Sequence, residues 1–116
     1  MKETLSVSEL FCLKNKLAVV IGGGGHLCSS MAKGLAMAGA SIVIVDIRLE
    51  KALKVSQKIK NIYKVETMAV ESDVTKEDHL EEALKLILDK NKTIDILING
   101  AGINSPKPFL EITLQE

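Results

Sequence analysis

The sequence predicts an α/β fold in which helices cover a doubly wound parallel β-sheet. Four short apolar runs have the pattern of buried strands, and three stretches with helical spacing separate them. A glycine-rich turn directly follows the first run. Because strands and helices alternate, right-handed crossovers place the strands parallel in one sheet. We expect four strands and three helices in a single domain that spans residues 1–116.

The first two strands, at residues 17–21 and 41–45, are continuous rather than alternating apolar runs. A run that is apolar at every position is typical of a strand covered on both faces, as in a parallel sheet. The third candidate strand, 65–70, is less purely apolar, and the fourth spans 94–98.

The first expected helix spans 27–38 and carries small and apolar residues on one stripe. Within that stripe Gly34 and Ala38 would let the helix lie close to the sheet, and Gly39 supplies a left-handed stop. The full stripe consists of Met31, Gly34, Leu35 and Ala38.

The second helix is expected from Leu49 to about Ile59, and the third opens with Thr75 and Asp78 at capping-box spacing. The core stripe of the second helix is Leu49, Ala52, Leu53, Ser56 and Ile59. The core face of the third is Leu80, Ala83, Leu84 and Ile87.

The two ends of the chain are expected to differ from this regular pattern. Residues 1–14 form a lead-in segment, in which Leu10, Phe11 and Leu13 pack against the rim of the sheet. After the fourth strand only residues 100–116 remain, too few for another helix and strand. The fourth strand would then be an open apolar edge. We therefore expect this sequence to be the N-terminal part of a longer chain.

Composition excludes several classes of function. Apolar residues make up 47% and charged residues 26%, which is typical of a globular protein. Fifteen basic residues balance fifteen acidic ones, so nothing indicates a nucleic-acid or membrane partner. No apolar run has membrane-spanning length, and no secretory signal is present. Cys12, Cys28 and His26 offer neither a disulfide framework nor a metal site. We expect a cytoplasmic protein.

The glycine-rich turn Gly22–Gly25 runs from the first strand into the first helix. Glycines allow a sharp turn and a close approach of the backbone to an anion. The helix that follows presents free N–H groups and a positive dipole end to that anion. In this context the turn meets the criterion for a dinucleotide-binding fingerprint. His26 could hydrogen-bond a phosphate there, or it could simply be solvated.

Asp46 ends the second strand, at the position where an acidic residue accepts hydrogen bonds from an adenosine ribose. The alternative is that Asp46 caps the helix that follows. The two roles can coexist.

Two further motifs complete the pattern: Asp73-Val74-Thr75 after the third strand, and Asn99-Gly100-Ala101-Gly102 after the fourth. With the glycine-rich turn, they resemble the short-chain dehydrogenase/reductase family, whose signatures are T-G-x-x-x-G-x-G and N-N-A-G. The similarity runs from about Leu10 to Thr113. Within this family, the sequence resembles the branch that contains the D-mannonate oxidoreductases, which are also called fructuronate reductases.

The resemblance implies a Rossmann-type fold and hydride transfer between a nicotinamide cofactor and a carbonyl or alcohol substrate. The implied substrate is a small molecule, a sugar acid by branch resemblance, and the full-length protein would be a homo-oligomer. The cofactor would be NAD, with NADP less favoured. The implied cofactor-binding residues are Gly22, Gly25, His26, Leu27, Asp46, Asp73, Val74, Asn99, Ala101 and Gly102.

Several positions depart from the family pattern. Ile21 replaces the threonine, His26 occupies a usual glycine position, Cys28 replaces the third glycine and Gly100 replaces the second asparagine. Because cysteine is small, we expect the first helix to move outward only slightly.

The family's catalytic Ser and Tyr-x-x-x-Lys are absent from this stretch. The single tyrosine, Tyr63, is followed four residues later by Thr67, and it falls between a helix and a strand. No catalytic residue is therefore assigned. Two alternatives remain: a dinucleotide sensor without catalysis, and an S-adenosylmethionine methyltransferase.

Overall fold

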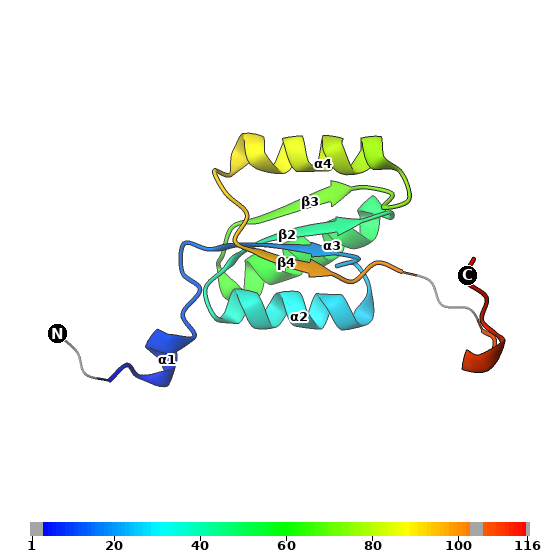
Figure 1. The fold of residues 1–116 in the computed structure, drawn as a ribbon. Coiled ribbons are helices and arrows are strands. Elements are labelled where there is room, and N and C mark those ends of the chain that lie inside the picture. Colours follow the sequence, from blue (N-terminus) through cyan, green and yellow to red (C-terminus); the bar gives the residue numbers. More distant parts are fainter. Residues whose placement is uncertain (1–3, 103–105, 116) are drawn as a thin grey trace.

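The computed structural model describes residues 4–102 and 106–115. Four parallel strands form one sheet in the order β3-β2-β1-β4 (Figure 1). Their bounds are Leu17–Ile21 for β1, Ser41–Asp46 for β2, Thr67–Glu71 for β3 and Ile96–Asn99 for β4. The strand order reverses between β1 and β4, so the expected doubly wound parallel sheet is confirmed.

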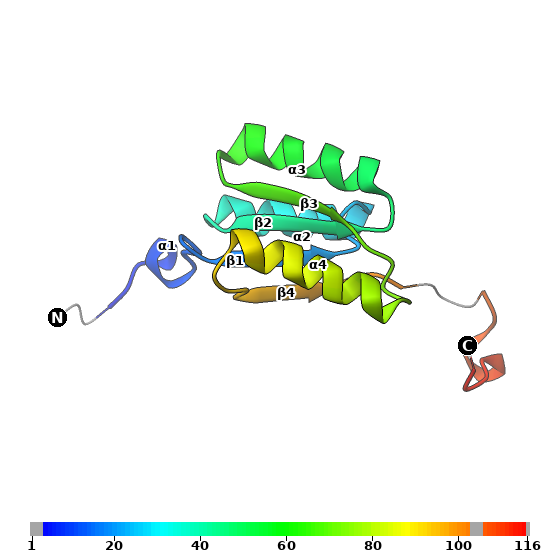
Figure 2. The same ribbon diagram turned by 90° about the horizontal axis from the view of Figure 1, so that it is seen from above.

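Helices cover both faces of this sheet. Helices α2 (His26–Met37) and α3 (Leu49–Tyr63) pack on one face, and α4 (Glu77–Lys90) packs on the other. Figure 2, seen from above, shows α4 in front of β1 and β2, with α2 behind them. No helix in the described part of the chain is both long and apolar enough to cross a membrane.

The two-sided covering explains why β1 and residues 42–45 of β2 are apolar at every position. Ala18 and Val20 point into the cluster under α2 and α3, whereas Leu17 and Val19 point into the cluster under α4. Successive side chains of a strand point to opposite faces, so both sets must be apolar when both faces are buried. Strands β3 and β4 begin two residues later than expected, at Thr67 and Ile96.

Helix α2 presents a different face to the sheet from the one expected. Its buried residues are Cys28, Ala32 and Ala36, whereas Gly34 is exposed and an added Cβ there would meet no atom within 4 Å. The expectation that Gly34 allows close approach is wrong, because the alanine stripe makes that contact. The stop at Gly39 is confirmed: its φ is +104°, and the Ala40 N–H donates to the Leu35 carbonyl at 3.1 Å.

Helix α3 continues to Tyr63, so this tyrosine is the last helical residue and does not lie between a helix and a strand. Only part of each expected core stripe is buried: Leu49 and Leu53 of α3 are exposed, as are Leu80 and Leu84 of α4. The buried residues are Ala52, Ser56 and Ile59 in α3, and Ala83 and Ile87 in α4.

The expected capping box of α4 is also wrong. The N-cap residue is Lys76, and no side chain caps this helix. The Thr75 hydroxyl instead donates to Asp73 Oδ1 at 2.7 Å. A serine or threonine hydroxyl can form a local hydrogen bond within a turn in place of a cap on the helix N–H groups, and Thr75 does so here.

The lead-in segment holds a short helix, α1 (Val7–Leu10), which was not expected. A capping box between Ser6 and Glu9 defines its start. Phe11 is 70% exposed and Leu10 is also exposed, so the expectation that they pack against the rim is wrong. Leu13 does pack against the core, and its N–H donates to the Ala38 carbonyl at 2.8 Å. A single 3₁₀ turn, η1 (Phe109–Glu111), lies well away from the sheet (Figures 1 and 2).

Candidate functional site

A pocket of about 430 Å³ lies at the carboxyl ends of the strands, where the strand order reverses. In open α/β sheets ligands bind at this point. The pocket is formed by the loops that follow β1, β2 and β3 and by the segment after β4. A larger hollow of about 640 Å³ lies between β3 and α4, and it shares only Ile47 and Asp73 with this pocket.

The turn after β1 folds back on the sheet through its backbone. The N–H groups of Gly22 and Gly23 both donate to the Val45 carbonyl, at 2.7 and 3.2 Å. Gly22 has a φ of +75°, and an added Cβ would lie 3.0 Å from the Gly100 carbonyl carbon. Both the backbone conformation and the close approach therefore require glycine at this position.

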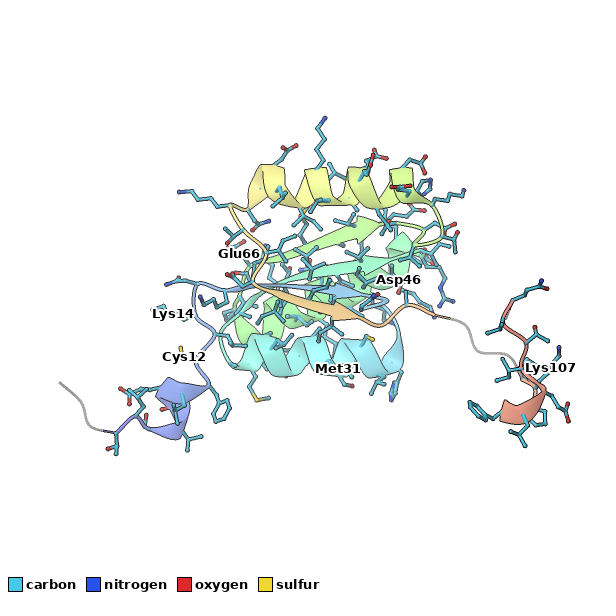
Figure 3. All side chains as sticks on the ribbon, viewed as in Figure 1. Cys12, Lys14, Met31, Asp46, Glu66 and Lys107 are labelled. Carbon is cyan, nitrogen blue, oxygen red and sulfur yellow. The ribbon has the colours of Figure 1, made fainter. Side chains whose placement is uncertain are left out.

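Asp46 joins the turns that follow β1 and β2. It is 8% exposed, and its Oδ2 accepts the Gly24 N–H at 3.0 Å while its Oδ1 accepts the Arg48 N–H at 3.0 Å. Figure 3 places Asp46 at the carboxyl end of the sheet. The N-cap residue of α3 is Arg48, and no side chain caps that helix, so the alternative role of Asp46 as a helix cap is wrong.

Asp73 and Thr75 form a tight turn after β3. Asp73 Oδ1 accepts from the Thr75 hydroxyl at 2.7 Å and from the Thr75 N–H at 3.0 Å. These two hydrogen bonds lower the pKa of the Asp73 carboxyl below its ordinary value, and the bond from the Thr75 hydroxyl has the larger effect. The neighbouring Ser72 is 2% exposed and also lines the pocket. Its hydroxyl is buried without a hydrogen-bond partner in the described residues.

The segment after β4 forms the remaining wall. The Gly100 N–H donates to the Ile21 carbonyl at 3.0 Å, which continues the β1–β4 ladder by one step. Gly100, Ala101 and Gly102 line the pocket, whereas Asn99 is exposed and lies outside the lining.

The pocket brings together most of the residues that the sequence singled out. Those that line it are Gly22, Gly25, Asp46, Asp73, Val74, Ala101 and Gly102. The lining residues outside the predicted cofactor-binding set are Ile21, Val45, Ile47, Arg48, Ser72, Thr75 and Gly100. Four of them, Ile47, Arg48, Ser72 and Thr75, lie beside the predicted aspartates along the chain. That adjacency is the signal that could have found them.

His26, Leu27 and Asn99 do not line the pocket. Leu27 points to solvent, and His26 lies in a separate hollow of about 420 Å³ between α2 and α3. Lysines from both helices line that second hollow: Lys33, Lys51, Lys54 and Lys58.

Tyr63 lies at the opposite end of the sheet from the pocket. Helix α3 begins directly after β2 and runs back along the sheet, so its last residue reaches the amino ends of the strands. There the ring packs against the core cluster. No group of three or more His, Cys, Asp or Glu side chains that could hold a metal ion occurs among the described residues.

This chain matches a known protein family and curated relatives. The family model described as short chain dehydrogenase matches residues 16–116. An uncharacterized oxidoreductase of Haemophilus influenzae is 38% identical over 107 residues, which cover 92% of this chain and 37% of the relative. This chain therefore spans less than two fifths of that relative's length.

Two solved structures share the fold of this chain. A putative D-mannonate oxidoreductase from Haemophilus influenza with bound NAD has a TM-score of 0.77 and 38% identity, over 87% of this chain and 36% of its own. L-sorbose reductase from Gluconobacter frateurii, complexed with NADPH and L-sorbose, has a TM-score of 0.81 and 24% identity. The latter match covers 90% of this chain and 40% of its own, and it shows the fold alone.

Proposed function

Because this chain belongs to the short-chain dehydrogenase family, we propose that it forms the cofactor-binding part of a nicotinamide-dependent oxidoreductase. The reaction is hydride transfer between the nicotinamide and a carbonyl or alcohol. The proposal is carried by one observation: the Asp46 carboxylate and the Gly22–Gly25 turn meet at one pocket, at the reversal of strand order.

The residues at this pocket fit a dinucleotide. Gly22 lets the turn pass close to the segment after β4, since a Cβ there would lie 3.0 Å from the Gly100 carbonyl and the Ala101 nitrogen. Gly22 and Gly25 line the pocket without side chains, so a pyrophosphate can approach their backbone. The first turn of α2 directs its N–H groups and positive dipole end to the same place. Asp46 retains acceptor capacity for the ribose hydroxyls, since each of its oxygens accepts one backbone bond.

The remaining site residues have assigned roles in the proposal. Asp73 and Val74 flank the adenine, whereas Asn99, Ala101 and Gly102 approach the nicotinamide ribose. Gly25 and Leu27 lie along the phosphates and nicotinamide side, and His26 is assigned to a phosphate. When bound, the nicotinamide accepts or supplies the hydride, and this chain orients it. The acid/base group is assigned to no residue of this stretch.

The preferred cofactor in this proposal is NAD, and the substrate is a sugar acid of the D-mannonate or D-fructuronate type. Asp46 supports the cofactor preference, and the similarity to a putative D-mannonate oxidoreductase with bound NAD supports both. The full-length protein is proposed to be a cytoplasmic homo-oligomer.

The test uses the full-length protein. We expect NAD to raise the unfolding temperature, and NAD with D-mannonate to produce NADH. Stabilisation by NAD without turnover of any sugar acid or simple alcohol would instead indicate a dinucleotide sensor. Stabilisation by S-adenosylmethionine but not by NAD or NADP would refute the proposal and favour a methyltransferase.

A further inference from the structure

The Cys28 thiol occupies the space that a side chain at residue 100 would need. A Cβ added to Gly100 would overlap Cys28 Sγ, well inside van der Waals contact. The same Cβ would lie 3.7 Å from Cys28 Cβ, which is an ordinary contact. The conflict with Cys28 therefore arises from its sulfur and not from its Cβ.

The two residues come from different parts of the chain. Cys28 lies in the first turn of α2, is 7% exposed and belongs to the core cluster under α2 and α3. Gly100 directly follows β4 and lines the pocket. The thiol thus joins the hydrophobic core to one wall of the site.

The segment that begins at Gly100 is held from two other directions. Its N–H donates to the Ile21 carbonyl at 3.0 Å. On the side of the glycine-rich turn, a Cβ on Gly22 would lie 3.0 Å from the Gly100 carbonyl and from the Ala101 nitrogen. Because Cys28, Ile21 and Gly22 stand on three sides of this segment with little room for added atoms, a displacement of Gly100 must move the wall relative to the turn and change the pocket.

We propose that Cys28 is a positioning residue for the pocket wall formed by Gly100, Ala101 and Gly102. Residues 28 and 100 form a size-matched pair. The space between α2 and this wall accommodates either the Sγ atom of Cys28 or a Cβ atom at residue 100, but not both. The departures from the family pattern at these two positions then compensate each other. The predicted effect on NAD binding rests on the proposed function, whereas the packing does not.

The test is a double-mutant cycle in the full-length protein, with Cys28→Ala, Gly100→Ala and both changes together. Gly100→Ala alone should weaken NAD binding about tenfold or more, the range of coupling energies for residues in contact. In the Cys28→Ala background the same change should weaken it about threefold or less, because the sulfur is gone. The added Cβ also lies 3.1 Å from the Ile21 oxygen, but this contact is common to both backgrounds and cancels.

Thermal unfolding without ligand provides a second readout of the same cycle. Gly100→Ala should lower the unfolding temperature more in the wild-type background than in the Cys28→Ala background. If Gly100→Ala does not fold, the proposed coupling of residues 28 and 100 requires that the double variant folds. Gly34→Ala, in the same helix but in open space, serves as the control and should leave NAD affinity unchanged in both backgrounds.

Equal losses in both backgrounds would overturn the inference, as would failure of the double variant to fold. If the wild-type protein binds neither NAD nor NADP, the proposed function fails. The unfolding temperatures of the four forms would still decide whether residues 28 and 100 are coupled.

Discussion

At the scale of single residues, Asp46 is oriented by the polypeptide before any ligand binds. Its two oxygens accept backbone N–H groups from the turns after β1 and β2. NADP would bring a phosphate with roughly two negative charges to the adenosine ribose. Two like charges about 4 Å apart repel by about 4 kcal/mol at an effective dielectric near 20, and solvent leaves roughly a quarter to a half of that.

We therefore predict that Asp46→Ser lowers the ratio of the NADP to the NAD dissociation constant about tenfold, as one to two kcal/mol implies. Titration calorimetry with both cofactors measures it. Arg48→Ala is the matched control, because Arg48 also lines the pocket but carries the opposite charge. Its ratio should stay the same or rise. An unchanged ratio in Asp46→Ser would show that this carboxylate does not discriminate.

Ser72 and Ser56 are both buried, but only one of them has a satisfied hydroxyl. Ser56 Oγ donates to the Leu53 carbonyl at 3.2 Å, whereas Ser72 Oγ has no partner in the described part of the chain. A buried unpaired hydroxyl carries a desolvation penalty of about 1–3 kcal/mol. Ser72→Ala should therefore raise the free energy of unfolding, and Ser56→Ala should lower it by about 1 kcal/mol. Urea unfolding of both variants decides, and the same sign for both would contradict the argument.

The residues whose place at the pocket could be predicted are those whose position follows from local order along the chain. Gly22 directly follows β1, Asp46 is the last residue of β2 and Asp73 lies two residues after β3, so their place at the carboxyl edge needed only the strand assignment. The contact between Cys28 and Gly100 joins residues far apart in the sequence, and no pattern of residue types reveals it. The unpaired hydroxyl of Ser72 is equally invisible, because it depends on what surrounds the side chain.

At the scale of elements, the strands were easier to predict than the helix faces. Strand β1 and residues 42–45 of β2 are buried on both sides, so each of these positions had to be apolar. Helix α2 is rich in small residues on more than one face, and the sequence could not choose between the stripe with Gly34 and the stripe with Ala32 and Ala36. Packing against the sheet made that choice.

Two glycines of this helix should respond to substitution in opposite directions. Gly34 is helical, exposed and in open space, so Gly34→Ala should stabilise the protein by about 0.5–1 kcal/mol. Gly39 has a φ of +104°, and an added Cβ would lie 3.3 Å from the Lys14 nitrogen. Gly39→Ala should destabilise by about 1 kcal/mol or more. Urea denaturation midpoints check both signs, and stabilisation by Gly39→Ala would show that this helix end rearranges freely.

At the scale of the whole molecule, the sheet is well covered at its centre and less so at β4. Residues 42–45 of β2 are almost fully buried, whereas Leu97 in the middle of β4 is 60% exposed. Within the described residues β4 pairs only with β1. A parallel strand with apolar side chains and an unpaired edge is a template for association with another chain.

We accordingly predict that the 116-residue chain, expressed alone, self-associates through β4. Leu97→Lys should reduce the association, because a charge on an exposed edge strand opposes pairing and its ammonium can stay in water. Leu110→Lys is the control: this leucine is also exposed, but it lies in η1, away from the sheet. Sedimentation velocity over a range of concentrations measures the effect, with circular dichroism to verify that helix content is unchanged. If the wild-type chain remains a dispersed monomer with a sharp unfolding transition, β4 needs no covering partner. If Leu97→Lys and Leu110→Lys change the association equally, the association does not use the β4 edge.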